Sequence, residues 1–200
     1  MGCMKFRKLL ISTLALALLG GTAVYAADAV VQKMRVVVNK KEVKEFNDAV
    51  AIVDGKSYLS VEALRQNVDG IFLTDEGTKK VSIYKPNVHM ITRKDGNMFT
   101  DVPKGYKVKF NVFSQIDSLK VDISAFKVTI DDPYGESTWI DGRSAIDKDF
   151  PEVGKENFYF LTSDITYSFD SAGKYVIRFW MKPDGESSYQ VVSEKVINSK

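Results

Sequence analysis

The sequence predicts a mainly β protein in which a small α+β module precedes an antiparallel β-sandwich. Apolar and polar residues alternate in most candidate strands, helix signals are confined to one short segment, and turn formers separate the segments. Strict alternation places every second side chain on a buried face and the others in water, which is typical of antiparallel sheets.

The first 26 residues have the three parts of a secretory signal peptide. Residues 5–8 form a basic head, the apolar stretch Leu9–Leu19 follows, and Val24-Tyr25-Ala26 provides a small-x-small cleavage pattern. The apolar stretch is shorter than the ~20 residues of a membrane-spanning helix, so we expect cleavage after residue 26, with retention as an anchor as the alternative. The predicted mature chain is secreted or associated with the cell wall, with no membrane attachment.

Cleavage would also change the chemistry that is available to the chain. It removes three basic residues and Cys3, the only cysteine, and the formal net charge changes from +2 to −1. No thiol then remains for a disulfide, cysteine catalysis or structural zinc, and the basic footprint of a nucleic-acid-binding protein is missing. His89 is the single histidine. We therefore expect neither a catalytic triad nor nucleic-acid binding.

The first module is expected to begin with two short hairpins. The β-branched run Met34–Val38 returns at Glu42-Val43 after a turn at Asn39-Lys40, and Ala49–Val53 and Ser57–Leu59 flank Asp54-Gly55. An Asp-Gly pair between apolar runs is a strong hairpin signal, because both central residues of the favoured turn need positive φ.

One helix is expected, at residues 61–66. Ser60 can cap its first amides, and Glu62 lies near the positive end of the helix dipole. Two further strands, Ile71–Leu73 and Val81–Tyr84, flank a turn that follows the helix.

Residues 30–85 contain four motifs in a distinctive order: Val36–Asn39, Asp54–Leu59, Glu62–Leu64 and Thr78–Ile83. In this order they resemble the copper amine oxidase N-terminal-like domain, or stalk domain, of Gram-positive secreted and surface proteins. Lys40, Ser60 and Thr74 stand where that family usually has Gly, Pro and Trp. The resemblance implies a small α+β surface module. Copper is not expected, because amine oxidase chemistry needs several histidines.

Residues 86–97 are expected to connect this module to an all-β domain at residues 96–198. Apolar and polar residues alternate in Tyr106–Val112, Phe126–Ile130 and Ile165–Phe169, whereas Tyr175–Met181 is apolar on both faces and is predicted to be a central strand. About seven strands with turns between them are typical of a β-sandwich.

The segment Phe169–Ile177 looks like the entry to the penultimate strand of immunoglobulin-like domains. Tyr175 then takes the place of the corner tyrosine, and Ile177 stands where antibody domains have a cysteine. Adhesins, spacers and sugar-binding proteins share this fold, so the resemblance does not define a function.

Acidic residues gather in the long loop that is predicted between Ile130 and Phe158. They are Asp131, Asp132, Glu136, Asp141, Asp147, Asp149 and Glu152. A pair of carboxylates is the minimum for a glycosidase, and hard oxygen ligands suit calcium. The calcium candidates are Asp131, Asp132, Asp141, Asp147 and Asp149. The simpler interpretation is a solvated acidic loop without a cofactor.

Two aromatic residues of the same loop, Tyr134 and Trp139, are candidates for ligand binding. Aromatic faces stack on sugar rings, and an exposed indole is costly to leave in water without a partner. Trp180 and Tyr189 are further candidates for sugar stacking, although Trp180 lies in an apolar strand and is therefore expected in the core.

These observations predict a non-catalytic binding or spacer protein of the cell envelope. Its partner would be a cell-wall component or another surface protein. A carbohydrate-binding module is the first alternative, and a small carboxylate-dependent hydrolase is the second.

Overall fold

The computed structural model describes residues 37–38, 41–42 and 50–200 and divides the chain into two units, residues 1–60 and 61–200. The predicted signal peptide at residues 1–26 lies outside the described residues. Among the described residues, no helix is both long and apolar enough to cross a membrane.

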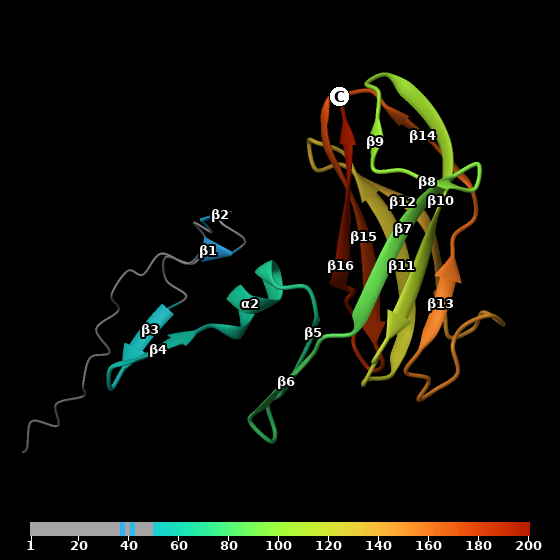
Figure 1. Cartoon of the computed structure of the whole chain (residues 1–200). Coiled ribbons are helices and arrows are strands. Elements are labelled where there is room, and N and C mark those ends of the chain that lie inside the picture. The colour runs from blue at the N-terminus through green and yellow to red at the C-terminus, as the bar shows by residue number, and fades with distance from the viewer. Residues whose placement is uncertain (1–36, 39–40, 43–49) are drawn as a thin grey trace, which may run out of the picture. The chain divides into compact units, whose positions relative to one another are not determined.

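The described part of the first unit consists of two antiparallel hairpins (Figure 1). Strand β1 (Val37–Val38) pairs with β2 (Lys41–Glu42), and β3 (Val50–Val53) pairs with β4 (Lys56–Leu59). Asp54 and Gly55 have φ angles of 50° and 73°. The Asp-Gly turn predicted from the sequence is therefore confirmed.

The second unit begins with helix α2 (Val61–Asn67) and the hairpin of β5 (Ile71–Asp75) and β6 (Lys80–Tyr84). Both elements are confirmed. The Gly70 amide donates to the Val191 carbonyl at 2.9 Å, and the Gln190 side chain bonds both the amide and the carbonyl of Phe72, at 2.8 and 3.2 Å. These bonds attach the hairpin to strand β16 (Gln190–Ser199). The predicted module at residues 30–85 thus spans the division between the two units.

The rest of the second unit is an antiparallel β-sandwich. One sheet has the order β13-β10-β7-β8, and β14 pairs with the first half of β10. The other has the order β12-β11-β15-β16-β9, in which only the short β9–β16 pair is parallel. The bounds are β7 Asn87–Lys94, β8 Asn97–Met98, β9 Asp101–Val102, β10 Tyr106–Asp117, β11 Ile123–Asp131, β12 Ser137–Ser144, β13 Phe158–Leu161, β14 Ile165–Phe169 and β15 Gly173–Pro183.

The structure corrects two sequence-based assignments. Residues 87–94 form strand β7 rather than a connector, because Val88, Met90 and Thr92 alternate inward and pair with β10. The long loop predicted between Ile130 and Phe158 contains the eight-residue strand β12. In contrast, the central position of β15, between β11 and β16, is confirmed.

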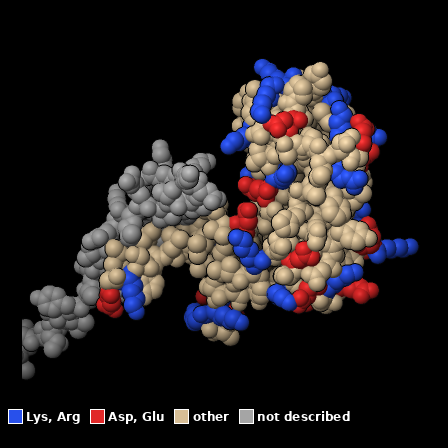
Figure 2. Space-filling model, in the orientation of Figure 1, with Lys and Arg blue, Asp and Glu red and all other residues tan. Residues whose placement is uncertain are grey.

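The core lies between the two sheets and is centred on aromatic rings. Phe126 is 1% exposed, and its ring centroid lies 4.9 Å from that of Phe160, 5.5 Å from Phe179 and 5.8 Å from Phe150. At one end of the core, the Tyr175 hydroxyl accepts from the Ser171 amide at 3.1 Å and donates to its carbonyl at 3.2 Å. Charged residues of both signs are interspersed on the face drawn in Figure 2.

Candidate functional site

The outer face of the β12-β11-β15 sheet carries a group of aromatic side chains. Lys127 of β11 pairs with Trp180 of β15, and Thr129 of β11 pairs with Trp139 of β12. Directly opposed residues in antiparallel strands project from the same face of a sheet. Because Lys127 also contacts Tyr189, three aromatic residues share this face: Trp139, Trp180 and Tyr189. We refer to them as the aromatic platform.

Trp139 is held against the backbone of its own strand. A Cβ atom placed on Gly142 would lie 2.7 Å from the Phe126 carbonyl oxygen, and 2.8 Å from Cη2 and 2.9 Å from Cζ2 of the indole, so only glycine leaves room for both the neighbouring strand and the ring. The side of the indole away from Gly142 remains in water, and Trp139 is 55% exposed.

Trp180 is fixed by polar contacts on the same face. Its Nε1 donates to Thr129 Oγ1 at 2.9 Å, and Lys127 Nζ lies 5.1 Å from the indole centroid and 4.5 Å from the ring centroid of Tyr189. Thr129, opposite Trp139, is only 5% exposed. The prediction that Trp180 lies in the core is therefore wrong: it covers the outside of the sheet.

Asp141 stabilises the strand that carries Trp139. Its carboxylate accepts the amides of Gly142 at 2.8 Å and Ser163 at 2.7 Å, and it pairs with Arg143 at 2.9 Å. Burial acts to raise the pKa of Asp141, but these hydrogen bonds outweigh it and hold the pKa below its usual value. The ionised carboxylate thus ties β12 to the β13–β14 connection.

A cleft of about 330 Å³ adjoins the other end of the platform, at Trp180 and Tyr189. Arg178 lines it, donates to Glu194 at 2.7 Å and pairs with Asp131, which is 7% exposed. Asp69 also lines the cleft, where burial raises its pKa, the neighbouring Glu194 adds to the rise, and Lys85 and Arg178 oppose it. The cleft therefore offers both hydrogen-bond donors and acceptors beside the aromatic rings.

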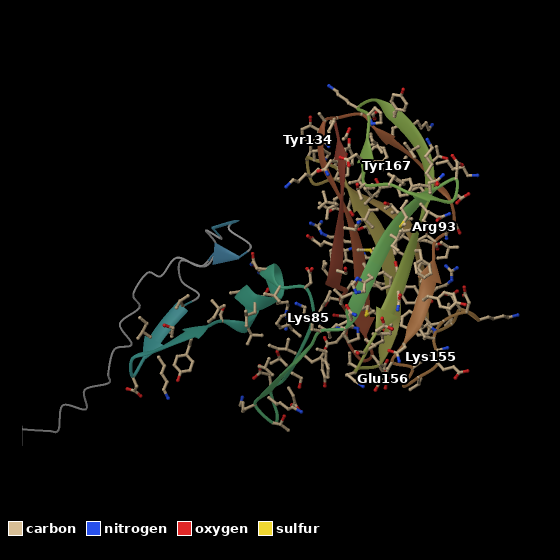
Figure 3. The ribbon with its side chains drawn as sticks, viewed as in Figure 1. Lys85, Arg93, Tyr134, Lys155, Glu156 and Tyr167 are labelled. Carbon is tan, nitrogen blue, oxygen red and sulfur yellow. The ribbon has the colours of Figure 1, made fainter. Side chains whose placement is uncertain are left out.

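The two predicted ligand-binding residues are held in different ways. Trp139 belongs to the platform, whereas Tyr134 lies in the β11–β12 turn, is 80% exposed, and has its hydroxyl 3.4 Å from Ser171 Oγ. Figure 3 shows Tyr134 at the end of the sandwich opposite to Lys155 and Glu156. No ring contact joins Tyr134 to Trp139 among the described residues.

The predicted calcium ligands each have protein partners. Asp131 pairs with Arg178, and Asp141 and Asp149 both pair with Arg143. Asp132 accepts the amides of residues 134 and 136, and Asp147 accepts the amide and hydroxyl of residue 144. Within the described ranges, no three His, Cys, Asp or Glu side chains are grouped so that they could hold a metal ion. These carboxylates hold the strand β12 and its flanking loops in place.

From the sequence, Trp139, Trp180 and Tyr189 were candidates for sugar stacking, but the outward direction of Trp180 and the contact of Lys127 with two of these rings were missed. The alternation in β15 contained the signal for Trp180. Phe179 and Met181 are buried on one face of the strand, so Trp180 must lie on the opposite face, together with Arg178. Tyr189 lies outside the strands, so no alternation predicted which face it shares.

The platform is suited to a flat, extended ligand. Trp139 and Trp180 lie opposite residues that are two apart in β11, and their strands, β12 and β15, lie about 10 Å apart because one strand separates them. This spacing is comparable with the length of a disaccharide. Comparison with models of protein families finds no match to the chain, and comparison with curated proteins finds none either.

Proposed function

We propose that this protein is a non-catalytic binding module of the cell envelope that binds a glycan chain on the aromatic platform. The observation that carries the proposal is the exposed indole of Trp139, held against Gly142 on the same sheet face as Trp180. A surface aromatic ring that is fixed in place loses little conformational freedom when a ligand stacks on it.

A glycan fits the chemistry of this surface better than a purely apolar ligand does. Pyranose rings have C–H faces that stack on indoles, and hydroxyl edges that need hydrogen-bond partners. Trp139 and Trp180 of the platform provide the aromatic surface for stacking. Arg178 and Glu194 of the adjoining cleft provide hydrogen-bond partners for the hydroxyl groups. The open sheet surface favours a chain of several sugars over a single enclosed one.

The proposal also includes a location at the cell surface and an immunoglobulin-like form of the β-sandwich. The signal peptide pattern at residues 1–26 and the resemblance of residues 30–85 to stalk domains support a place at the cell surface, with the wall glycan as ligand. The hydrogen bonds between Tyr175 and Ser171 support an immunoglobulin-like form of the sandwich. The pairing of the loop carboxylates with arginines and amides supports a non-catalytic role.

The proposal is tested by retention of the purified full-length chain on insoluble peptidoglycan and on chitin. Trp139→Ala should weaken binding about tenfold, the effect of losing about 1.4 kcal/mol of stacking. Tyr159→Ala is the matched control, because Tyr159 is 76% exposed on the other sheet of the sandwich. Equal retention of the two variants and the wild type would refute the glycan proposal.

A protein-binding or spacer role is a second candidate, favoured by the outer face of the other sheet. Phe113 and Tyr159 stack there at 6.2 Å, and Leu161, opposite Phe113, is 47% exposed. Tyr159→Ala should then lower retention on protein-containing envelope fractions and leave retention on pure polysaccharide unchanged. The two variants therefore distinguish the two candidates.

A further inference from the structure

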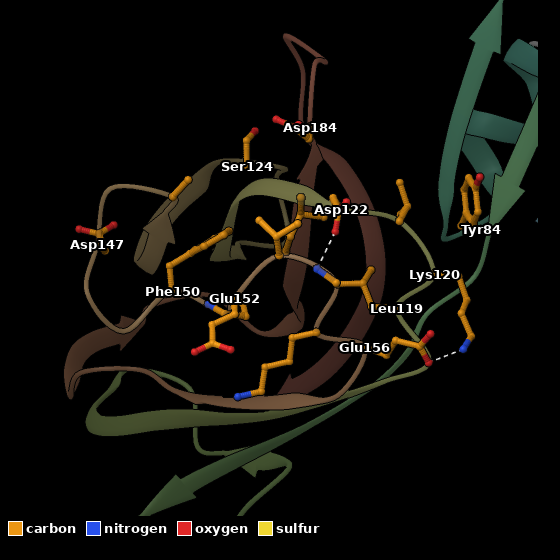
Figure 4. A pocket seen from close by; sticks show the side chains of 17 residues that line it. Tyr84, Leu119, Lys120, Asp122, Ser124, Asp147, Phe150, Glu152, Glu156 and Asp184 are labelled. Carbon is orange, nitrogen blue, oxygen red and sulfur yellow. Dashed lines mark hydrogen bonds and ion pairs between the residues drawn. The ribbon is translucent and has the colours of Figure 1, made fainter.

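A cavity of about 760 Å³ opens at the end of the sandwich away from Tyr134 (Figures 3 and 4). Its walls come from the β10–β11 connection (119–124), the β12–β13 connection (145–156), Tyr84 and Asp184. We refer to it as the end cavity. Its volume lies within the range of small-molecule sites, ~300–1,000 Å³.

The floor of the end cavity is apolar and continuous with the core. Leu119 is 5% exposed, and Phe150 stacks on Phe126 at the centre of the core. Val121 and Ile123 are half-buried beside them. An apolar group in the cavity would therefore contact side chains that the core already holds in place.

Hydrogen bonds across the end cavity fix its walls. The Leu119 amide donates to the Glu156 carbonyl at 3.0 Å, and the Gly154 amide donates to Asp122 Oδ1 at 2.9 Å. The Asp184 amide donates to the Asp122 carbonyl at 2.9 Å. Three separate connections are thus joined around one opening, so the cavity is preformed.

The end cavity is lined by more negative than positive charge. Its lining has five carboxylates and two lysines. The carboxylates are those of Asp122, Asp147, Glu152, Glu156 and Asp184, and the lysines are Lys120 and Lys155. Lys120 pairs with Glu156. The side chains of Glu152 and Asp184 make no hydrogen bond or ion pair with any described residue. These two carboxylates can therefore pair with a cation from outside.

We propose that the end cavity binds a small amphipathic amine, an apolar group that carries a primary ammonium. The apolar group lies on Leu119 and Phe150, and the ammonium lies at the acidic rim, where Glu152 and Asp184 stand on opposite sides of the opening (Figure 4). The site does not depend on the aromatic platform, so its ligand is distinct from the proposed glycan.

Three probes with the same apolar body test the charge preference: 3-phenylpropylamine, 3-phenylpropanol and 3-phenylpropanoate. Each is titrated into the full-length chain and followed by the amide resonances of Gly154 and Lys155. The amine should bind about threefold more tightly than the alcohol, and the carboxylate should bind most weakly. The difference between amine and alcohol should shrink at about 0.5 M salt, where exposed charges are screened, while binding of the alcohol persists.

Glu152→Gln combined with Asp184→Asn should lower the affinity of the amine to that of the alcohol. Both residues are exposed, so the fold should not change. Glu136→Gln removes an exposed carboxylate in the turn that carries Tyr134 and is the matched control, and Trp139→Ala should leave amine binding unchanged. Equal affinities for the three probes, or resonance shifts confined to residues outside the cavity, would overturn the proposal.

Discussion

The outer faces of the two sheets both carry exposed aromatic residues, but they hold them differently. On the β12-β11-β15 face, Trp139 lies against Gly142 and Trp180 donates to Thr129. On the other face, Tyr159 is 76% exposed and its ring contact is with Phe113. A ring held by several contacts loses less conformational freedom when it stacks on a ligand than a ring with fewer contacts does. Exposure alone therefore does not identify a binding surface.

The ion pairs of the two faces differ in the same way. Arg178 lies beside the platform and pairs with Asp131, whose side chain is 10% exposed, and with Glu194. On the other face, Lys109 pairs with Asp164, and both side chains are largely in water, at 70% and 47% exposure. The cost of breaking a pair depends on how buried the remaining charge is.

The largest expected effect comes from Arg178→Met. It leaves the carboxylate of Asp131 buried without its cation, and we expect a loss of about 2–3 kcal/mol in the free energy of unfolding, because Arg178 itself is partly exposed. The measurement is urea denaturation at neutral pH. The matched control, Lys109→Met, breaks the exposed pair and should cost less than about 1 kcal/mol. If the two variants lost similar amounts of unfolding free energy, burial of the remaining charge would not explain a difference between the ion pairs of the two faces.

The next largest effect is expected from Gly142→Ala. The added Cβ would meet the Phe126 carbonyl oxygen at 2.7 Å and the indole of Trp139 at 2.8 Å, so it would strain the β11–β12 pair as well as displace the ring. Glycan affinity should fall about fivefold, slightly less than on removal of the ring, and stability should fall by about 2 kcal/mol. Ser137→Ala, at an exposed position of the same strand, is the control and should bind like the wild type. Unchanged affinity in Gly142→Ala would show that the placement of Trp139 is not needed.

Local signals in the sequence predicted the elements but not the surfaces that they form. The turn at Asp54-Gly55, the helix from Val61 and the central position of β15 follow from turn chemistry, capping and apolar pattern. Strand β12 was missed because it is an edge strand in which polar residues and Gly142 flank Trp139 and Ile140, so the segment resembles a loop.

The platform could not be predicted, because it depends on register between strands that are distant in sequence. Irregularities between Val128 and Thr129 and between Phe179 and Trp180 set which residues share a face. A one-residue slip would turn Trp180 to the other side of its sheet. The sequence indicated Trp139, Trp180 and Tyr189 as candidates, whereas their common face and the support of Trp139 by Gly142 needed the structure.

Acid should weaken the edge of the platform more than the opposite face. The pKa of Asp141 is lowered in the folded chain, so its contribution to stability is present above its unfolded pKa of about 3.9 and is lost as pH falls through the lower folded value. Asp141→Asn should lower stability at neutral pH by about 1–2 kcal/mol, because two amides and Arg143 lose an ionised acceptor. Its melting temperature should therefore change less than that of the wild type between about pH 5 and pH 3.

Asp164→Asn is the matched control for this pH dependence. Hydrogen bonds from Asn111 and Lys109 lower the pKa of Asp164 too, but its side chain is 47% exposed, so water also stabilises the charge. We expect its pH profile to follow that of the wild type closely. A wild-type profile in Asp141→Asn, or a larger change in Asp164→Asn, would contradict the assignment of acid sensitivity to the β12 edge.

The smallest expected effect is that of Lys127→Met. This change keeps most of the side-chain volume but removes the cation that lies 5.1 Å from the Trp180 centroid and 4.5 Å from that of Tyr189. The free energy of unfolding should fall by about 0.5–1 kcal/mol, and glycan affinity should change less than about twofold, because Trp139 still provides the exposed ring. Lys107→Met, at an exposed position of β10 in the other sheet, should leave both quantities unchanged. If Lys127→Met instead abolished glycan binding, Lys127 would itself be a ligand contact, and the platform would bind through its charge rather than through its rings.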